Sequence, residues 1–240
     1  MTSSSARTAS GARPVRTLVL VALAGLAAFL LALAAVALGG RLAPLDGQGL
    51  AVAHELARTL PDGAVRTVTA LGAFPTIAAV VGAAALALVA RGRPRAAAAL
   101  VVGFVAIAVT VRLVKAGVAR PRPPGHDRTL TNASFPSAHA AYSTAWTAVA
   151  LVLTRLRAGA HTGARARRPV VAGALLVTLA VGATRPLLDA HFLSDVVAGW
   201  GLGAALFALA GALALAVGPM RHTRRADGDR SAPERTETTA

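Results

Sequence analysis

Long apolar blocks divide this sequence, and they constrain its fold more than any other feature. The blocks are rich in Ala, Leu and Val, and each is close to the roughly twenty residues that a helix needs to cross a bilayer. A soluble domain of this size would show apolar stripes instead, and its core would need more than the 4% of aromatic residues present here. We therefore predict an all-α polytopic membrane bundle of about six transmembrane helices. The expected spans are residues 17–38, 68–90, 96–114, 137–154, 169–184 and 196–217.

Two of these blocks can be interpreted in more than one way: the fifth is short for a membrane span, and the first could be a signal sequence. As a helix, block 169–184 rises only about 24 Å, so it must run upright, thin the bilayer, or continue helically past Arg185. Three arginines precede the first block, as in a signal peptide, but its apolar stretch is longer than that of an ordinary signal sequence. We expect an uncleaved first helix.

Positive charge gathers between the blocks and gives the chain a formal net charge of +15. Sixteen of the 25 Lys and Arg residues lie in the N-terminal tail, at 91–95, at 155–168 and after Met220. These regions share one side of the membrane if six helices alternate, and the positive-inside rule makes that side cytoplasmic. No nucleic-acid-binding motif accompanies the charge, so the bilayer surface, not nucleic acid, is the expected partner.

We expect one membrane domain, residues 17–218, between two disordered cytoplasmic tails at 1–16 and 219–240. The tails are rich in polar residues and lack an apolar period. The chain has no cysteine, which excludes disulfides and thiolate metal sites. No internal repeat supports an inverted-repeat transporter, and the sequence leaves the oligomeric state open.

Three separated stretches on the expected outer side hold nearly all the residues suited to phosphate chemistry. The first runs from Lys115 through Arg122 to Pro123, where a continuing helix would set the two cations on one face about two turns apart. The second is Pro-Ser-Ala-His at 136–139. The third runs from Arg185 through His191 to Asp195.

The second and third stretches also suit phosphate chemistry by their local geometry. Pro136 fits the first position of a helix, which would place Ser137 and His139 in a first turn whose free N–H groups bind phosphate. His191 and Asp195 are four positions apart and would face the same way on a helical turn. Asp195 can then accept from Nδ1–H of His191, which leaves Nε2 unprotonated and nucleophilic.

The order and spacing of these stretches resemble the three-part signature of the type 2 phosphatidic acid phosphatase superfamily. That superfamily also includes bacterial lipid phosphatases, glucose-6-phosphatase and vanadium haloperoxidases. The resemblance covers about residues 96–200, with Ala138 where the family usually has Gly and Thr184 where Ser is common. It implies a catalytic group of His191, His139 and Asp195. It also implies phosphate binding by Lys115, Arg122, Ser137 and Arg185.

The resemblance implies an integral membrane lipid phosphatase that works through a phosphohistidine intermediate. The candidate substrates are a phosphatidate, a phosphatidylglycerol phosphate and an undecaprenyl diphosphate, with envelope lipid recycling as the leading hypothesis by analogy. We expect neither a cofactor nor a metal, because Asp127, Asp189 and Asp195 are too few carboxylates for a two-metal site. The active site would face the extracytoplasmic side. The alternatives are a phosphotransferase that uses the same histidine and a non-catalytic phospholipid transporter or binding protein.

Polar residues outside the signature receive weaker interpretations. His126 and Asp127 lie in a loop near the site and are more simply solvated than in contact with a headgroup. Asp189 could pair with Arg185 or face water. His54 and Glu55 fit an interfacial amphipathic segment together with Leu50, Val52 and Leu56.

Overall fold

The protein folds into a bundle of helices, as the apolar blocks predict. The computed structural model describes residues 4–38, 43–157 and 163–217, in which eight helices and no strand occur. The prediction of an all-α fold is confirmed. The helices are α1 Ser4–Ala37, α2 Ala43–Ala57, α3 Asp62–Ala70, α4 Phe74–Ala90, α5 Pro94–Val118, α6 Ala138–Arg157, α7 Gly163–Leu187 and α8 Leu193–Ala216.

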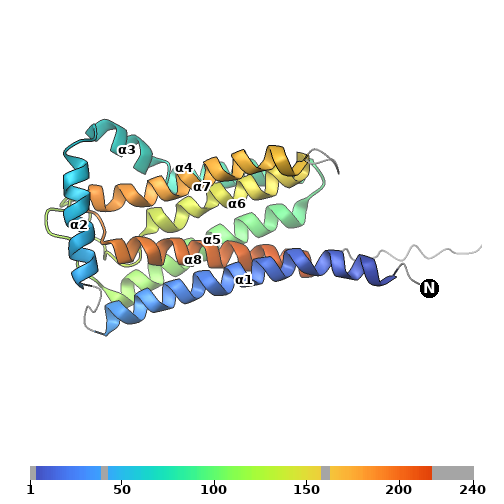
Figure 1. Ribbon diagram of the computed structural model, residues 1–240, viewed down its shortest axis with the longest axis horizontal. Coiled ribbons are helices and arrows are strands. Elements are labelled where there is room, and N and C mark those ends of the chain that lie inside the picture. Colours follow the sequence, from blue (N-terminus) through green and yellow to red (C-terminus); the bar gives the residue numbers. More distant parts are fainter. Residues whose placement is uncertain (1–3, 39–42, 158–162, 218–240) are drawn as a thin grey trace, which may run out of the picture.

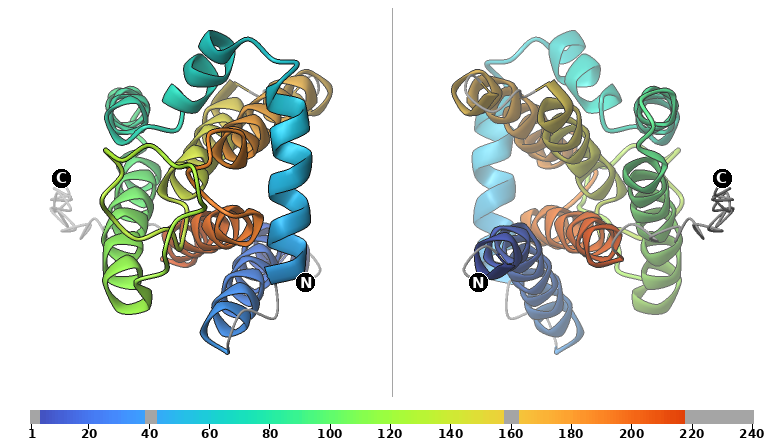
Figure 2. Two further views of the ribbon diagram at one scale, coloured as in Figure 1. Left: turned by 90° about the vertical axis from the view of Figure 1, so that its left-hand side faces the viewer. Right: turned by 90° about the vertical axis from the view of Figure 1, so that its right-hand side faces the viewer.

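Six long helices run side by side along the molecule, while the shorter α2 and α3 lie at one end (Figure 1). Helix α8 packs against α1, α5 and α6, and twelve of its 24 residues are buried. Close packing along α8 depends on small residues. A Cβ added at Gly25 of α1 would lie 2.6 Å from the carbonyl oxygen of Gly201. Seen from its two ends, the bundle shows α1 on one side of α8 and α5 on the other (Figure 2).

The outer surface of the bundle is apolar, as a bilayer requires. Large side chains such as Leu31, Leu86, Leu113 and Leu176 are each about two-thirds or more exposed. In the described ranges four helical segments are long and apolar enough to cross a membrane, and α3 with α4, bent by 44°, forms a fifth candidate. These segments agree with a multi-pass membrane protein.

The fourth expected span, 137–154, forms α6, which by composition alone is less apolar than the described helical segments able to cross a membrane. Its hydroxyl groups face neighbouring helices instead of lipid. Ser143 Oγ donates to the carbonyl of Thr178 on α7 at 3.2 Å, and Thr178 Oγ1 donates to the carbonyl of Ser143 at 2.9 Å. Burial between helices therefore satisfies polar groups that would be costly at a lipid-facing position.

One expected span is divided into two helices. The expected span 68–90 is interrupted between α3 and α4, where Ala73 is extended and Pro75 occupies the first turn of α4. Gly72 lies in this break, and a Cβ there would come within 3.0 Å of the carbonyl oxygen of His139. The break thus brings this segment against the start of α6.

The other differences concern helix lengths. Helix α7 runs to Leu187, so the short fifth block takes the predicted alternative of continuing past Arg185. Helix α1 begins at Ser4, so most of the segment expected to be a disordered tail at 1–16 is helical. The expected tail at 219–240 lies outside the described residues.

Candidate active site

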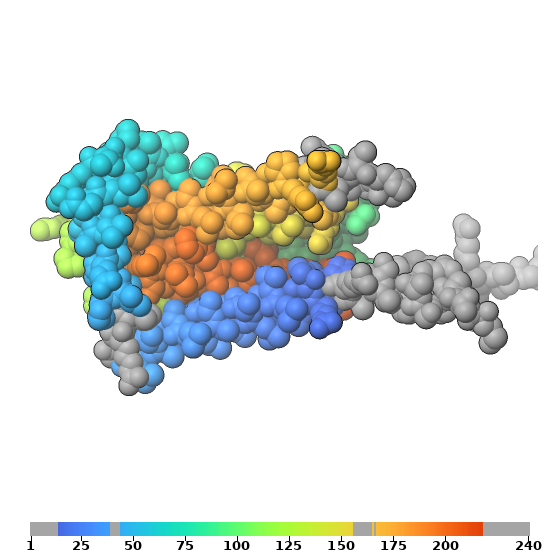
Figure 3. All heavy atoms as spheres, in the orientation of Figure 1, coloured from blue at the N-terminus to red at the C-terminus, as the bar shows by residue number. Residues whose placement is uncertain are grey.

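The three signature stretches meet at the end of the bundle that α2 covers. Helix α5 ends there at Val118, α6 begins there at Ala138, and α7 gives way there to α8. The loop between α5 and α6 and helices α2 and α3 lie around these helix ends (Figure 2, left). A space-filling view shows α2 lying across this end of the molecule (Figure 3).

Lys115 and Arg122 converge by a route that the sequence did not predict. The continuous helix expected through Arg122 is wrong, because α5 ends at Val118 and Ala119 takes a left-handed conformation with φ 50°. Instead, the loop before α6 binds both cations. Lys115 Nζ donates to the carbonyls of Ala133 and Ser134, and Arg122 Nε donates to the carbonyl of Asn132 at 2.9 Å.

The second stretch begins its helix later than predicted. Pro136 is not the first helical residue, because α6 starts at Ala138 and Ser137 precedes it as the N-terminal capping residue. The hydroxyl oxygen of Ser137 accepts from the backbone N–H of Ala140 at 3.5 Å, which leaves its own proton available to a ligand. The backbone N–H of Ser137 donates to the carbonyl of Asp195 at 2.9 Å, so the starts of α6 and α8 are joined.

His139 lies in the first turn of α6 and is half-buried. The charges of Arg185, Arg122 and Lys115 all act on its ring, and His191 does so as well. His139 therefore belongs to the same electrostatic cluster as the phosphate-binding candidates.

His191 lies just before α8, with only 2% of its surface exposed. The expected helical turn is wrong, since α8 begins at Leu193, but the four-residue spacing still brings His191 Nδ1 within 3.5 Å of Asp195 Oδ2. The other nitrogen, Nε2, is 3.4 Å from Arg122 Nη1. Burial lowers the pKa of His191 to about 4, against the opposing effect of Asp195. The imidazole is thus neutral near pH 7, with Nδ1 facing the carboxylate and Nε2 facing an arginine.

Arg185 is buried at the end of α7, with 5% of its surface exposed. Its Nη1 donates to Thr69 Oγ1 on α3 at 2.6 Å. Its Nε is buried and has no hydrogen-bond partner among the described residues. A buried guanidinium with an unused donor is costly unless an acceptor is supplied, and a phosphate oxygen is such an acceptor.

Comparison with known proteins assigns the family. A sequence model of the PAP2 superfamily matches residues 96–216, half of the chain. The chain belongs to the PAP2 superfamily. The fold of this PAP2 protein is similar to the crystal structure of a transmembrane PAP2 type phosphatidylglycerolphosphate phosphatase from Bacillus subtilis. The TM-score is 0.68 and the identity 21%, with 82% of this chain and 99% of the other covered. A comparison with curated proteins gave no significant match.

Family membership confirms the resemblance that the three stretches indicated and supports a membrane phosphatase. The likeness to the Bacillus subtilis protein shows a shared fold. The individual roles of the site residues stay predictions, and their geometry is the basis for proposing them below.

Sequence reasoning missed Arg120, which lies within the first PAP2 stretch. Its Nη1 donates to Asp195 Oδ1 at 2.6 Å and to Ser194 Oγ at 2.8 Å, and its Nη2 donates to Asp46 Oδ2 at 2.7 Å. The guanidinium also lies 4.2 Å from the centre of the Phe192 ring. Arg120 therefore connects the carboxylate behind His191 to helix α2.

Asp46 and Ser134 were also missed. Asp46 is only 3% exposed, and it accepts from the backbone N–H of Ser194 at 2.9 Å as well as from Arg120. Ser134 Oγ donates to Asp195 Oδ2. The one local signal for Asp46 was an isolated acidic residue between two apolar blocks, which does not identify a partner 148 positions away.

Other polar residues take structural roles in this PAP2 fold. Asp189 pairs with His54 of α2, at 2.6 Å between Oδ1 and Nε2, and not with Arg185. Helix α2 has large exposed apolar side chains, as the interfacial interpretation expects. Asp127 accepts from the backbone N–H of Thr129, which lowers its pKa, and His126 Nδ1 lies 2.8 Å from the carbonyl oxygen of Pro123.

Proposed function

We propose that this chain is a membrane lipid phosphatase that hydrolyses a lipid phosphomonoester or diphosphate through a phosphohistidine at His191. The observation that carries the proposal is the placement of the buried, neutral imidazole, with Asp195 behind Nδ1 and Arg122 beside Nε2. A nucleophile backed by a carboxylate and facing a cation suits attack on a phosphorus atom whose oxygens that cation binds.

These positions support the following reaction. The Nε2 lone pair of His191 forms a bond to phosphorus while the bond from phosphorus to the lipid oxygen breaks, and His139 gives a proton to that oxygen. A water molecule then attacks the phosphohistidine, His139 takes the proton of the water, and inorganic phosphate leaves with His191 restored. Asp195 stabilises the positive charge that forms on the ring in the first step.

Charge on the transferred phosphoryl group is spread over its equatorial oxygens. Lys115, Arg122 and Arg185 would bind these oxygens, together with the hydroxyl of Ser137 and the first turn of α6. The unused Nε of Arg185 supports this assignment. In the described residues no group of three or more His, Asp or Glu side chains is arranged to hold a metal ion. The three cations can supply the neutralisation that a metal ion gives to other phosphatases, so we propose a metal-independent reaction.

The substrate that fits this site is amphipathic, because the site lies at the end of an apolar bundle where a lipid can enter laterally. The Bacillus subtilis protein with the similar fold is a phosphatidylglycerolphosphate phosphatase, which makes phosphatidylglycerol phosphate the first substrate to test. Phosphatidate and undecaprenyl diphosphate are the other two candidates. The positive-inside rule supports an active site on the extracytoplasmic side.

The test is phosphate release by detergent-purified protein from a panel of these three lipids, with and without excess chelator. We expect release to persist in chelator, to disappear in His191→Ala, and to persist in His126→Ala, whose ring nitrogen contacts the carbonyl of Pro123. Acid-labile labelling of the wild type and not of His191→Ala is expected as well. Wild-type turnover by His191→Ala, or complete and reversible loss on chelation, would contradict the mechanism. Product formation that depends on an added alcohol acceptor would indicate a phosphotransferase instead.

A further inference from the structure

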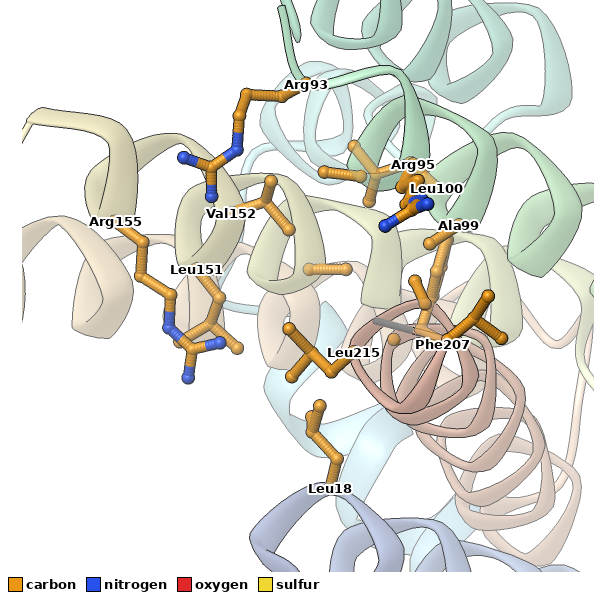
Figure 4. A pocket seen from close by; sticks show the side chains of 15 residues that line it. Leu18, Arg93, Arg95, Ala99, Leu100, Leu151, Val152, Arg155, Phe207 and Leu215 are labelled. Atoms are coloured by element: carbon orange, nitrogen blue, oxygen red, sulfur yellow. The ribbon is translucent and has the colours of Figure 1, made fainter. Parts of the chain in front are cut away.

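A cavity lies at the opposite end of the bundle from the candidate active site. Its volume is about 610 Å³, within the range of roughly 300–1,000 Å³ typical of small-molecule sites. The beginnings of α1 and α5 and the ends of α6 and α8 surround it. Figure 4 shows the side chains around this space, and most of them are apolar, including Leu100, Val152, Phe207 and Leu215.

Three arginines border the same cavity. Arg93 and Arg95 lie at the start of α5, and Arg155 lies near the end of α6 (Figure 4). All three are exposed, and none forms an ion pair with an acidic side chain in the described parts of the chain. Their charge is therefore available to an anion next to an apolar wall.

An apolar wall beside three arginines favours one kind of ligand. A small soluble anion would use the arginines but not the apolar wall, and a neutral lipid would use the wall but not the arginines. A phospholipid with a negatively charged headgroup uses both, because its phosphate can contact the guanidinium groups while an acyl chain lies against Phe207 and Leu215.

We propose that this cavity binds an anionic phospholipid from the leaflet opposite the candidate active site. The bound lipid is not the substrate, since the nucleophile His191 lies before the start of α8 and Leu215 lies at its other end. With the orientation proposed above, this leaflet is the cytoplasmic one, which is rich in anionic lipid. The inference rests on the arginines and the cavity and does not need the proposed reaction.

The test uses the full chain in detergent, with phosphatidylserine as the probe and phosphatidylcholine as the neutral comparison. Phosphatidylserine is a phosphodiester, so it is neither a proposed substrate nor a product of one. Native mass spectrometry should show one retained phosphatidylserine and much less phosphatidylcholine. The variant Arg93→Gln/Arg95→Gln/Arg155→Gln should bind phosphatidylserine roughly 10- to 100-fold more weakly.

A matched variant controls for the loss of charge. Arg91→Gln/Arg165→Gln/Arg168→Gln removes three exposed positive charges from the same end of the bundle, but none of these residues lines the cavity. We expect it to retain phosphatidylserine as the wild type does. Equal loss of binding in the two triple variants would overturn the proposal, and so would equal retention of phosphatidylserine and phosphatidylcholine by the wild type.

A second pair of variants tests the apolar wall. Ala99→Phe places a ring in the cavity, whereas Ala98→Phe places one on the exposed side of the same helix. Lipid retention should fall in the first and not in the second. Phosphatidylserine binding should also survive in His191→Ala, which separates this inference from the proposed reaction. Loss of binding in His191→Ala would overturn the assignment to a separate site.

Discussion

At the scale of single residues, Arg185 has hydrogen-bonding capacity that the described residues do not satisfy. Its Nη1 is held by Thr69, while its Nε is buried and unpaired. The neighbouring cations Arg122 and Lys115 are in a different state, because backbone carbonyls already accept from both. Arg185 is therefore the residue at which a bound phosphate would gain a donor that has no competing partner.

The change Arg185→Lys tests whether the guanidinium donates to phosphate, because it keeps the charge and removes the planar donor group. We expect kcat for lipid phosphate release to fall about 100- to 1,000-fold, as for the loss of one preorganised donor to a transition state. The control is Arg66→Lys, whose side chain is exposed and paired with Asp62. A wild-type kcat in Arg185→Lys would remove Arg185 from the proposed phosphate site.

His191 gives a prediction for pH dependence. Burial lowers its pKa from 6.5 to about 4, so the nucleophile stays deprotonated in mildly acidic solution. We expect kcat/KM, corrected for the titration of the substrate phosphate near about pH 6, to hold between pH 7 and 5 and to fall near pH 4. Folding stability should also decline as pH falls from 6.5 towards 4, because the unfolded chain binds the proton first. An acid limb of kcat/KM at the ordinary histidine pKa would contradict the buried, neutral imidazole.

At the scale of elements, the contact between α2 and the start of α8 connects an interfacial helix to the catalytic candidates. Asp46 of α2 accepts from Arg120 and from the backbone of Ser194, and Arg120 reaches Asp195. Asp46, Arg120, Asp195 and the backbone of Ser194 are buried or nearly so. Moving one of these groups would therefore leave another without its hydrogen-bond partner. The position of Asp195 behind His191 thus depends on where α2 packs.

The change Asp46→Asn should weaken this connection. It leaves Arg120 with a single carboxylate partner, and breaking a buried ion pair costs on the order of 3 kcal/mol of folding stability. We expect a lower melting temperature together with a lower kcat, while KM changes less. The control Glu55→Gln alters an exposed ion pair of the same helix and should shift stability by less than about 0.5 kcal/mol.

A double-mutant cycle that combines Asp46→Asn with Arg120→Gln shows whether Asp46 acts through its ion pair with Arg120. If Asp46 acts through Arg120, the two changes together should cost clearly less than the sum of the single changes. Additive effects on both stability and kcat would show that Asp46 acts independently of Arg120.

At the scale of the whole molecule, the two ends of the bundle differ in charge and in chemistry. One end has the catalytic candidates beneath α2, and the other has arginines around an apolar cavity. By the positive-inside rule, the distribution of Lys and Arg along the sequence predicts that the second end faces the cytoplasm. The orientation determines which leaflet supplies the proposed substrate.

The absence of cysteine from the sequence allows a direct test of orientation. Arg128→Cys introduces a thiol in the exposed loop near the candidate site, and Arg165→Cys introduces one at the opposite end. In intact cells a membrane-impermeant maleimide should label the first and should label the second only after permeabilisation. The reverse pattern would place the candidate active site in the cytoplasm.

The sequence predicted the positions of the helices better than it predicted the side-chain contacts at the candidate site. Helices α1, α5 and α8 follow from runs of about twenty apolar residues, and α7 from a shorter one, because insertion into a bilayer depends on local hydrophobicity. The four-residue spacing likewise identified His191 and Asp195 as a pair, although only Asp195 is helical and His191 lies before α8. The helix expected through Arg122 was wrong, because Ala119 ends it and the loop before α6 then binds the side chain.

The all-α membrane fold, the family and the candidate residues could be read from the chain alone, because each depends on short stretches of sequence. The partners of those residues became known only from the packing of the helices. Arg120 meets Asp195 across 75 positions, and Asp46 meets Ser194 across 148. No local pattern specifies such pairs, because they form only when packed helices exclude water and each buried charge must find its partners on a distant part of the chain.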